Sequence, residues 1–117
     1  MHLSFKEGFY IGIRVTGPSH NYLAIEFSDQ QVERIGIETL DPQGPPYLGP
    51  KIDGNEIAVV VLDVLSQLNK ELNTDYAVQT IRCYNSDTPY YQNYVLLTAK
   101  IIRFMHEREK VRNHVHS

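Results

Sequence analysis

The chain has 117 residues, a length typical of one domain. Hydrophobic residues make up 42% and charged residues 21%, which argues against a disordered or fibrous chain, and the single cysteine excludes an intramolecular disulfide. The longest apolar run, Ile57–Leu62, is too short for a membrane helix, and the N-terminus lacks the pattern of a secretory signal. We therefore expect a cytoplasmic α+β domain over residues 1–110, with a frayed tail at 111–117.

Alternating apolar and polar side chains in the first 40 residues predict three strands, over 9–15, 22–28 and about 33–39. Short connections favour an antiparallel meander with one covered face. The apolar residues expected to face the core are Phe9, Ile11, Ile13, Val15, Leu23, Ile25, Phe27, Ile35 and Ile37. The outer face would then carry small residues and could pair with a second copy of the chain as a homodimer. That face includes Tyr10, Gly12, Ala24 and Gly36.

The segment 41–54 contains four prolines and three glycines, a density that excludes both a helix and a central strand. Long connections of this kind are either rigid spans or functional loops. Both interpretations stay open from the sequence.

Two amphipathic helices are predicted after this segment. Asp53 and Glu56 have the spacing of a capping pair, and an apolar stripe at helical spacing runs to a helix end near Asn73. The first two turns carry further apolar residues, so we expect them to be covered on more than one side. A strand over Tyr76–Tyr84 precedes a second helix, from Pro89 to about Glu109.

The expected fold is therefore an α+β two-layer sandwich of order βββ-α-β-α, with a four-stranded, mostly antiparallel sheet and two helices on one face. This order of elements resembles that of the second domain of a small-subunit ribosomal protein and its relatives. The resemblance covers the element order only and includes no shared motif, so it implies a fold and no activity.

No motif indicates catalysis, a cofactor or a metal. Pro50 separates Gly49 from Lys51 where a phosphate-binding loop needs direct adjacency, and Ile52 replaces its hydroxyl. The histidines lie mostly near the chain ends, and Cys83 has no second cysteine at metal-ligand spacing. We expect a protein that is not an enzyme, with no cofactor and no metal.

Charge divides the chain into two unequal parts. Residues 1–99 hold 12 acids and 6 bases, a net charge of −6, whereas residues 100–117 hold 2 acids and 5 bases, a net charge of +3. An acidic body favours a basic partner and makes nucleic acid an unfavourable one. Tyrosine, which is enriched at protein interfaces, gathers near the start of the second helix.

The leading hypothesis is a small acidic protein-binding module, most concretely an inhibitor or immunity-type protein that occludes a basic partner such as a toxin nuclease. The residues expected to bind this partner are Glu38, Asp41, Tyr47, Asp53, Asp87, Tyr90 and Tyr91. One alternative is a ribosome- or RNA-associated module that uses four basic residues of the last helix: Lys100, Arg103, Arg108 and Lys110. The other is a small enzyme with a site between the 41–54 segment and residues 85–89, with a carboxylate pair or Cys83 as its reactive group.

Overall fold

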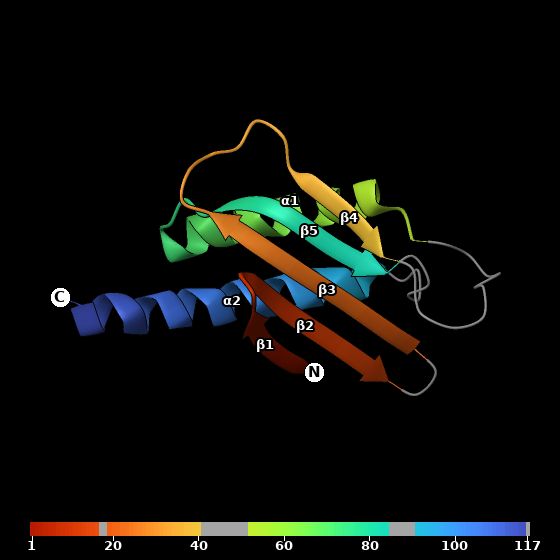
Figure 1. Ribbon diagram of the computed structural model, residues 1–117, viewed down its shortest axis with the longest axis horizontal. Coiled ribbons are helices and arrows are strands. Elements are labelled where there is room, and N and C mark those ends of the chain that lie inside the picture. The colour runs from red at the N-terminus through yellow and green to blue at the C-terminus, as the bar shows by residue number, and fades with distance from the viewer. Residues whose placement is uncertain (17–18, 41–51, 85–90, 117) are drawn as a thin grey trace.

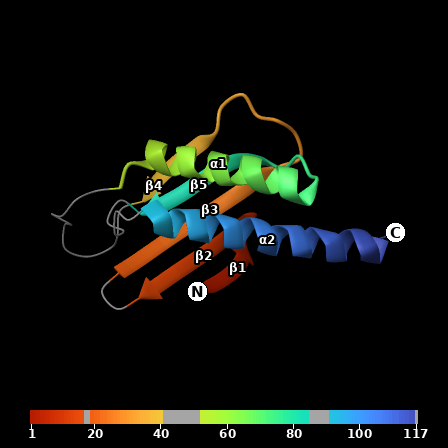
Figure 2. The same ribbon diagram turned by 180° about the vertical axis from the view of Figure 1, so that it is seen from behind.

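The computed structural model describes residues 1–16, 19–40, 52–84 and 91–116 (Figure 1). Its elements are β1 (His2–Lys6), β2 (Phe9–Thr16), β3 (Ser19–Ser28), β4 (Gly36–Leu40), α1 (Gly54–Leu72), β5 (Ala77–Tyr84) and α2 (Tyr91–His116). The strands form one mixed sheet in the order β1-β2-β3-β5-β4. Both helices cover the same face of this sheet (Figure 2). The two-layer α+β prediction is confirmed, with five strands in place of the expected four.

The additional strand, β1, forms a hairpin with β2. Lys6 pairs with Phe9, and the two residues between them, Glu7 and Gly8, have φ angles of 53° and 88°. Positive φ at both positions gives a turn whose twist matches that of the flanking strands. Gly8 adopts such an angle without steric cost, so the two-residue turn before an alternating strand was a signal for β1 that the sequence reading missed.

The sequence analysis expected the three predicted strands to form an antiparallel meander, and this is wrong for the third of them, β4. This strand pairs in parallel with β5 at the edge of the sheet, and β5 pairs with β3. Burial explains the order. Most of β4 is exposed, which suits an edge strand, whereas Val78, Ile81 and Cys83 of β5 are buried and need neighbours on both sides.

The predicted inner face of β2 is also wrong. Tyr10 and Gly12 face the helices, and a Cβ atom at Gly12 would lie 3.0 Å from Leu97 and 3.1 Å from Ile101. Helix α2 therefore crosses directly over Gly12, where only a missing side chain leaves room for it. Since alternate residues point to opposite faces, the apolar set that begins at Phe9 faces the open side of the sheet.

The other strands orient as expected. Leu23 and Ile25 are fully buried under the helices, and Phe27 packs against the same core. On β4, Ile37 faces the helix side but remains 36% exposed because it lies at the sheet edge. Of the expected outer-face residues, Ala24 and Gly36 do lie on the open side, whereas Tyr10 and Gly12 do not.

Helix α1 has the predicted ends. The Asp53 carboxylate caps it by accepting from the Asn55 backbone N–H at 2.9 Å, and Asn73 closes it in the left-handed conformation. The apolar stripe is buried as predicted, from Ile57 onward. The expected cover on more than one side of the first turns holds for Ala58, which is buried, and is wrong for Val59 and Leu62, which are 68% and 40% exposed.

Helix α2 is described from Tyr91 and continues past the expected end at Glu109 to His116. The expected start at Pro89 lies outside the described residues. The residues that bury its inner face are those predicted from helical spacing: Tyr94, Leu97, Ile101, Ile102 and Met105. Residue 117 lies outside the described residues, and the frayed tail stays a prediction.

Candidate functional site

Three of the seven residues expected to bind a partner lie in the described part of the chain: Glu38, Asp53 and Tyr91. The other four lie outside the described residues: Asp41, Tyr47, Asp87 and Tyr90.

Asp53 and Tyr91 meet where the two helices begin. The backbone N–H of Asp53 donates to the Tyr91 hydroxyl at 3.4 Å, although 38 positions separate the two residues. Burial raises the pKa of Tyr91, and a hydrogen bond to the Glu56 carboxylate raises it further. Tyr91 is therefore held, protonated, against the first turn of α1.

Glu38 lies elsewhere, on the open face of the sheet. Its carboxylate accepts from Nε of Arg82 on the neighbouring strand β5. The Arg82 guanidinium also lies over the Phe9 ring, 3.9 Å from the ring centroid. Glu38 thus belongs to a surface separate from the one that carries Asp53 and Tyr91.

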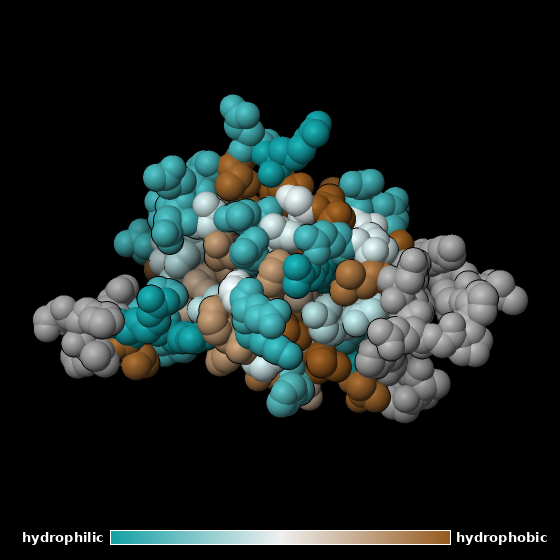
Figure 3. All heavy atoms as spheres, viewed as in Figure 1, coloured by the Kyte–Doolittle hydropathy of each residue, from teal (hydrophilic) through white to brown (hydrophobic). Residues whose placement is uncertain are grey.

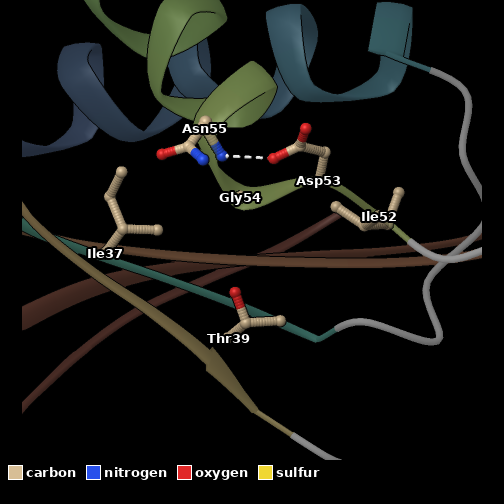
Figure 4. Close-up of a pocket in the computed structure, with 6 residues that line it drawn as sticks. All are labelled: Ile37, Thr39, Ile52, Asp53, Gly54 and Asn55. Carbon is tan, nitrogen blue, oxygen red and sulfur yellow. Dashed lines mark hydrogen bonds between the residues drawn. The ribbon is translucent and has the colours of Figure 1, made fainter.

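A shallow hollow of about 560 Å³ lies between β4 and the start of α1. Figure 4 shows its lining residues: Ile37, Thr39, Ile52, Asp53, Gly54 and Asn55. The helix start comes close to β4 here, because a Cβ atom at Gly54 would lie 2.8 Å from Ile37 and 3.0 Å from the Thr39 hydroxyl. Among the described lining residues Asp53 is the one carboxylate, and it caps α1, so these residues provide no acid–base pair for catalysis.

The outward side of α1 combines acidic and apolar side chains. Asp53, Glu56 and Asp63 are exposed there together with Val59 and Leu62, and we call these five residues the α1 surface. Residues three and four apart share one side of a helix, so Glu56, Val59 and Asp63 form a continuous row. Sequence reasoning missed Val59 and Leu62 because it assigned them to the core.

A second hollow, of about 330 Å³, lies at the opposite end of the sheet, against the late turns of α2. Its residues are Phe5, Gly8, Tyr10, Phe27, Ser28, Asp29, Tyr76, Met105, Glu109 and Arg112. Several polar groups of this hollow already bind one another or a neighbour. The Tyr76 hydroxyl lies 2.6 Å from Nδ1 of His106, and Arg112 donates to Glu109 at 3.1 Å.

The basic residues of α2 mostly have partners within the chain. Arg103 donates to Glu71 at 2.6 Å, and Lys110 lies 4.0 Å from Glu107. The Arg108 guanidinium stacks on Phe5, 3.7 Å from the ring centroid. The two ion pairs offset part of the positive charge that would attract a nucleic-acid phosphate.

The remaining candidates for catalytic chemistry are the Cys83 thiol and a metal site. The side chain of Cys83 is fully buried beneath the helices, where a substrate from solvent has no access to its sulfur. No group of three or more histidine, cysteine, aspartate or glutamate side chains is placed to hold a metal ion among the described residues.

Within the described ranges, no helix has the length and apolarity needed to cross a membrane. Comparisons of the chain with protein-family models, with curated proteins and with solved structures find no match.

Proposed function

We propose that this protein is a non-catalytic protein-binding module that holds a basic protein partner on the α1 surface. The observation that carries the proposal is the exposure of two large apolar side chains among three carboxylates on one side of α1. The concrete form is an inhibitor or immunity-type protein that occludes a basic enzyme, for example a toxin nuclease.

The apolar part of the α1 surface supports a protein partner. Val59 and Leu62 lie three positions apart and so share one side of the helix. An amphipathic helix of a free-standing domain carries polar residues on that side. Apolar side chains bordered by polar residues are the usual composition of an interface core and its rim.

The charged part supports a basic partner. Asp53, Glu56 and Asp63 are exposed, and α1 carries no basic residue before Lys70. Carboxylates spread over more than two helical turns attract a positively charged surface and speed its capture. The net charge of −6 over residues 1–99 acts in the same direction.

The two alternatives have weaker support. The RNA-binding hypothesis relies on the basic residues of α2. Of these, Arg103, Arg108 and Arg112 each contact a glutamate carboxylate or an aromatic ring of the same chain. The enzyme hypothesis relies on a reactive group near the 41–54 segment. The described candidates are weak, because Cys83 is buried and the Asp53 carboxylate caps α1.

The test begins with affinity capture of a basic protein from a lysate of the source, followed by purification of that protein and measurement of its binding kinetics. The double variant Glu56→Gln/Asp63→Asn removes two charges from the α1 surface. The control Glu7→Gln/Glu33→Gln removes two exposed charges outside it. Both double variants change the net charge equally.

We expect the α1 variant to slow association about tenfold at low salt, with the difference disappearing at high salt. The control should associate almost as fast as the wild type. Val59→Asp should shorten the lifetime of the complex, since it buries a charge in the apolar part. Equal slowing by both double variants, or full binding by the α1 variant, would place the partner elsewhere and refute the proposal.

A further inference from the structure

The hollow of about 330 Å³ against the late turns of α2 has an aromatic floor, and we call it the α2 hollow. Its rings meet at steep angles. Tyr10 and Phe27 have centroids 5.8 Å apart and planes inclined by 70°, and Phe27 and Tyr76 have centroids 6.5 Å apart and planes inclined by 63°. Buried Met105 also lines the hollow. Rings in this arrangement present faces as well as edges, so an occupant meets aromatic surface from more than one direction.

The rim of the α2 hollow is charged and, in balance, negative. Asp29, Glu109 and Arg112 line it, and Arg112 donates to Glu109 at 3.1 Å. Asp29 is exposed and forms no ion pair within the described residues. In Figure 3, hydrophilic side chains of the late turns of α2 lie beside more hydrophobic ones at this end of the sheet. One carboxylate of the lining therefore stays without an opposite charge.

The tyrosines of the floor respond to the negative charge of Glu109. After burial, this carboxylate is the strongest influence that raises the pKa of Tyr10 and of Tyr76. At Tyr10 its effect exceeds the opposing effect of either Arg108 or Arg112. A carboxylate that disfavours a tyrosinate in this way favours a cation at the same place.

Aromatic rings at this end of the sheet already attract a cation of the chain itself. The Arg108 guanidinium lies 3.7 Å from the centroid of Phe5 and 5.8 Å from that of Tyr10. No described cation lies over Phe27 or Tyr76. Ring faces attract cations through their quadrupole, and the attraction is greatest for a desolvated cation. The α2 hollow thus combines unused ring surface with an unpaired carboxylate.

We propose that the α2 hollow binds a small organic cation, an ammonium group carried on an apolar body. The rings of the floor contact the apolar body and the charge, and Asp29 supplies the opposite charge. An anion would meet two carboxylates at the rim. The volume is near the lower limit of ligand pockets, so it suits a free amine or one alkylated lysine side chain and excludes a cofactor of dinucleotide size.

The α2 hollow is independent of the α1 surface, and this proposal goes beyond the proposed function. Its lining comes from the hairpin of β1 and β2, the end of β3, the residue before β5 and the late turns of α2. All of these lie within the described ranges, and none belongs to the α1 surface. The two proposals can therefore fail separately.

The experiment is an NMR titration of the full chain with three probes of nearly the same shape. Choline is a cation, neohexyl alcohol is its uncharged isostere, and tert-butylacetate is an anion. The backbone amide signals of Gly8, Ser28 and Asp29 report binding at the rim. A short peptide with one trimethyllysine is the fourth probe, which distinguishes a protein side chain from a free amine as the source of the cation.

Two pairs of variants separate the charge from the rings. Asp29→Asn removes the opposite charge, and Asp63→Asn makes the same change at an exposed position on α1. Phe27→Leu removes a ring of the floor and keeps the side chain apolar. Phe104→Leu is its control, because Phe104 also packs against Tyr10 and does not line the hollow.

We expect choline to bind with a dissociation constant of about 1 mM, and the uncharged and anionic probes to bind at least about tenfold more weakly. Asp29→Asn and Phe27→Leu should each weaken choline binding by about threefold to tenfold, whereas the two control variants should not. Asp29→Asn should leave the binding of neohexyl alcohol unchanged. Tighter binding of the peptide than of choline would support the proposal with a lysine side chain as the source, and equal binding would support it with a free amine.

Three results would overturn the proposal. One is the absence of saturable shifts with both choline and the peptide. Another is equal or tighter binding of the uncharged or the anionic probe, because the carboxylates of the rim would then play no part. The third is equal weakening of choline binding by Asp29→Asn and Asp63→Asn, which would mean that the cation responds only to the net charge of the chain.

Discussion

Asn93 at the start of α2 donates its side-chain amide to the side-chain carbonyl of Asn21 on β3 across 2.8 Å, and both residues are buried. This bond fixes where α2 begins on the sheet. Asn93→Leu should lower the free energy of unfolding by about 1–3 kcal/mol, because it removes the donor that the buried Asn21 carbonyl uses. Chemical denaturation measures the change. Gln92→Leu, at the exposed neighbouring position, is the control and should change stability little. Equal effects of the two variants would contradict this role.

Gly12 and Gly36 both lie in strands, but only one of them has a helix against it. Gly12→Ala should destabilise the protein by about 1–3 kcal/mol, because the new Cβ would press on buried Leu97 and Ile101. Gly36→Ala meets Thr80 at an ordinary 3.5 Å and should be neutral or stabilising by about 0.5 kcal/mol. Thermal denaturation of the two variants gives the comparison. A larger loss for Gly36→Ala would mean that α2 does not cross over Gly12.

Stability should fall at alkaline pH because of buried tyrosines. Burial is the main cause that raises the pKa values of Tyr10, Tyr22 and Tyr76, whereas an unfolded tyrosine ionises near pH 10. A group whose pKa is higher in the folded state stabilises it fully below pH 10, and that stabilisation is lost as the pH rises through the folded value. Absorbance titration of tyrosinate should lag in the native protein relative to the same chain in denaturant. Superimposed titration curves would disprove the expectation.

Arg82 should contribute more to stability than the ion pair it forms. The pair with Glu38 is partly exposed and is worth about 0–1 kcal/mol. The guanidinium also covers Phe9, a contact that does not depend on the carboxylate. Arg82→Ala should therefore destabilise the protein by about 1 kcal/mol more than Glu38→Ala, as chemical denaturation of the two single variants would show. Equal losses for the two single variants would mean that the ring contact adds nothing.

Helical periodicity was the most informative part of the sequence. The spacing of apolar residues predicted both helices, their buried faces and the cap at Asp53, because a helix that packs on a sheet needs one continuous apolar stripe. The inner face of β2 was not predictable in the same way. The face with Phe9, Ile11, Ile13 and Val15 is the more apolar one, yet the face with Tyr10 and Gly12 lies against the helices, because α2 needs the space at Gly12.

The order of the strands in the sheet could not be predicted from the sequence either. Nothing local to β4 indicates that it lies beyond β5, since that position depends on which strand needs burial on both sides. The candidate site was predictable only in part. Asp53 and Tyr91 were predicted to bind a partner, and the structure places them in contact. Val59 and Leu62 were assigned to the core, because the exposure of an apolar residue depends on how its helix is rotated against the sheet.

The position of β4 has a consequence for how the molecule opens. This strand has five residues, pairs with β5 alone and is exposed along most of its length, so little is lost when it detaches. Local opening follows the least-supported contacts, and the amides of Gly36–Leu40 should exchange with solvent well before those of β3. Each opening exposes the unpaired edge of β5, a template onto which another chain can add a strand.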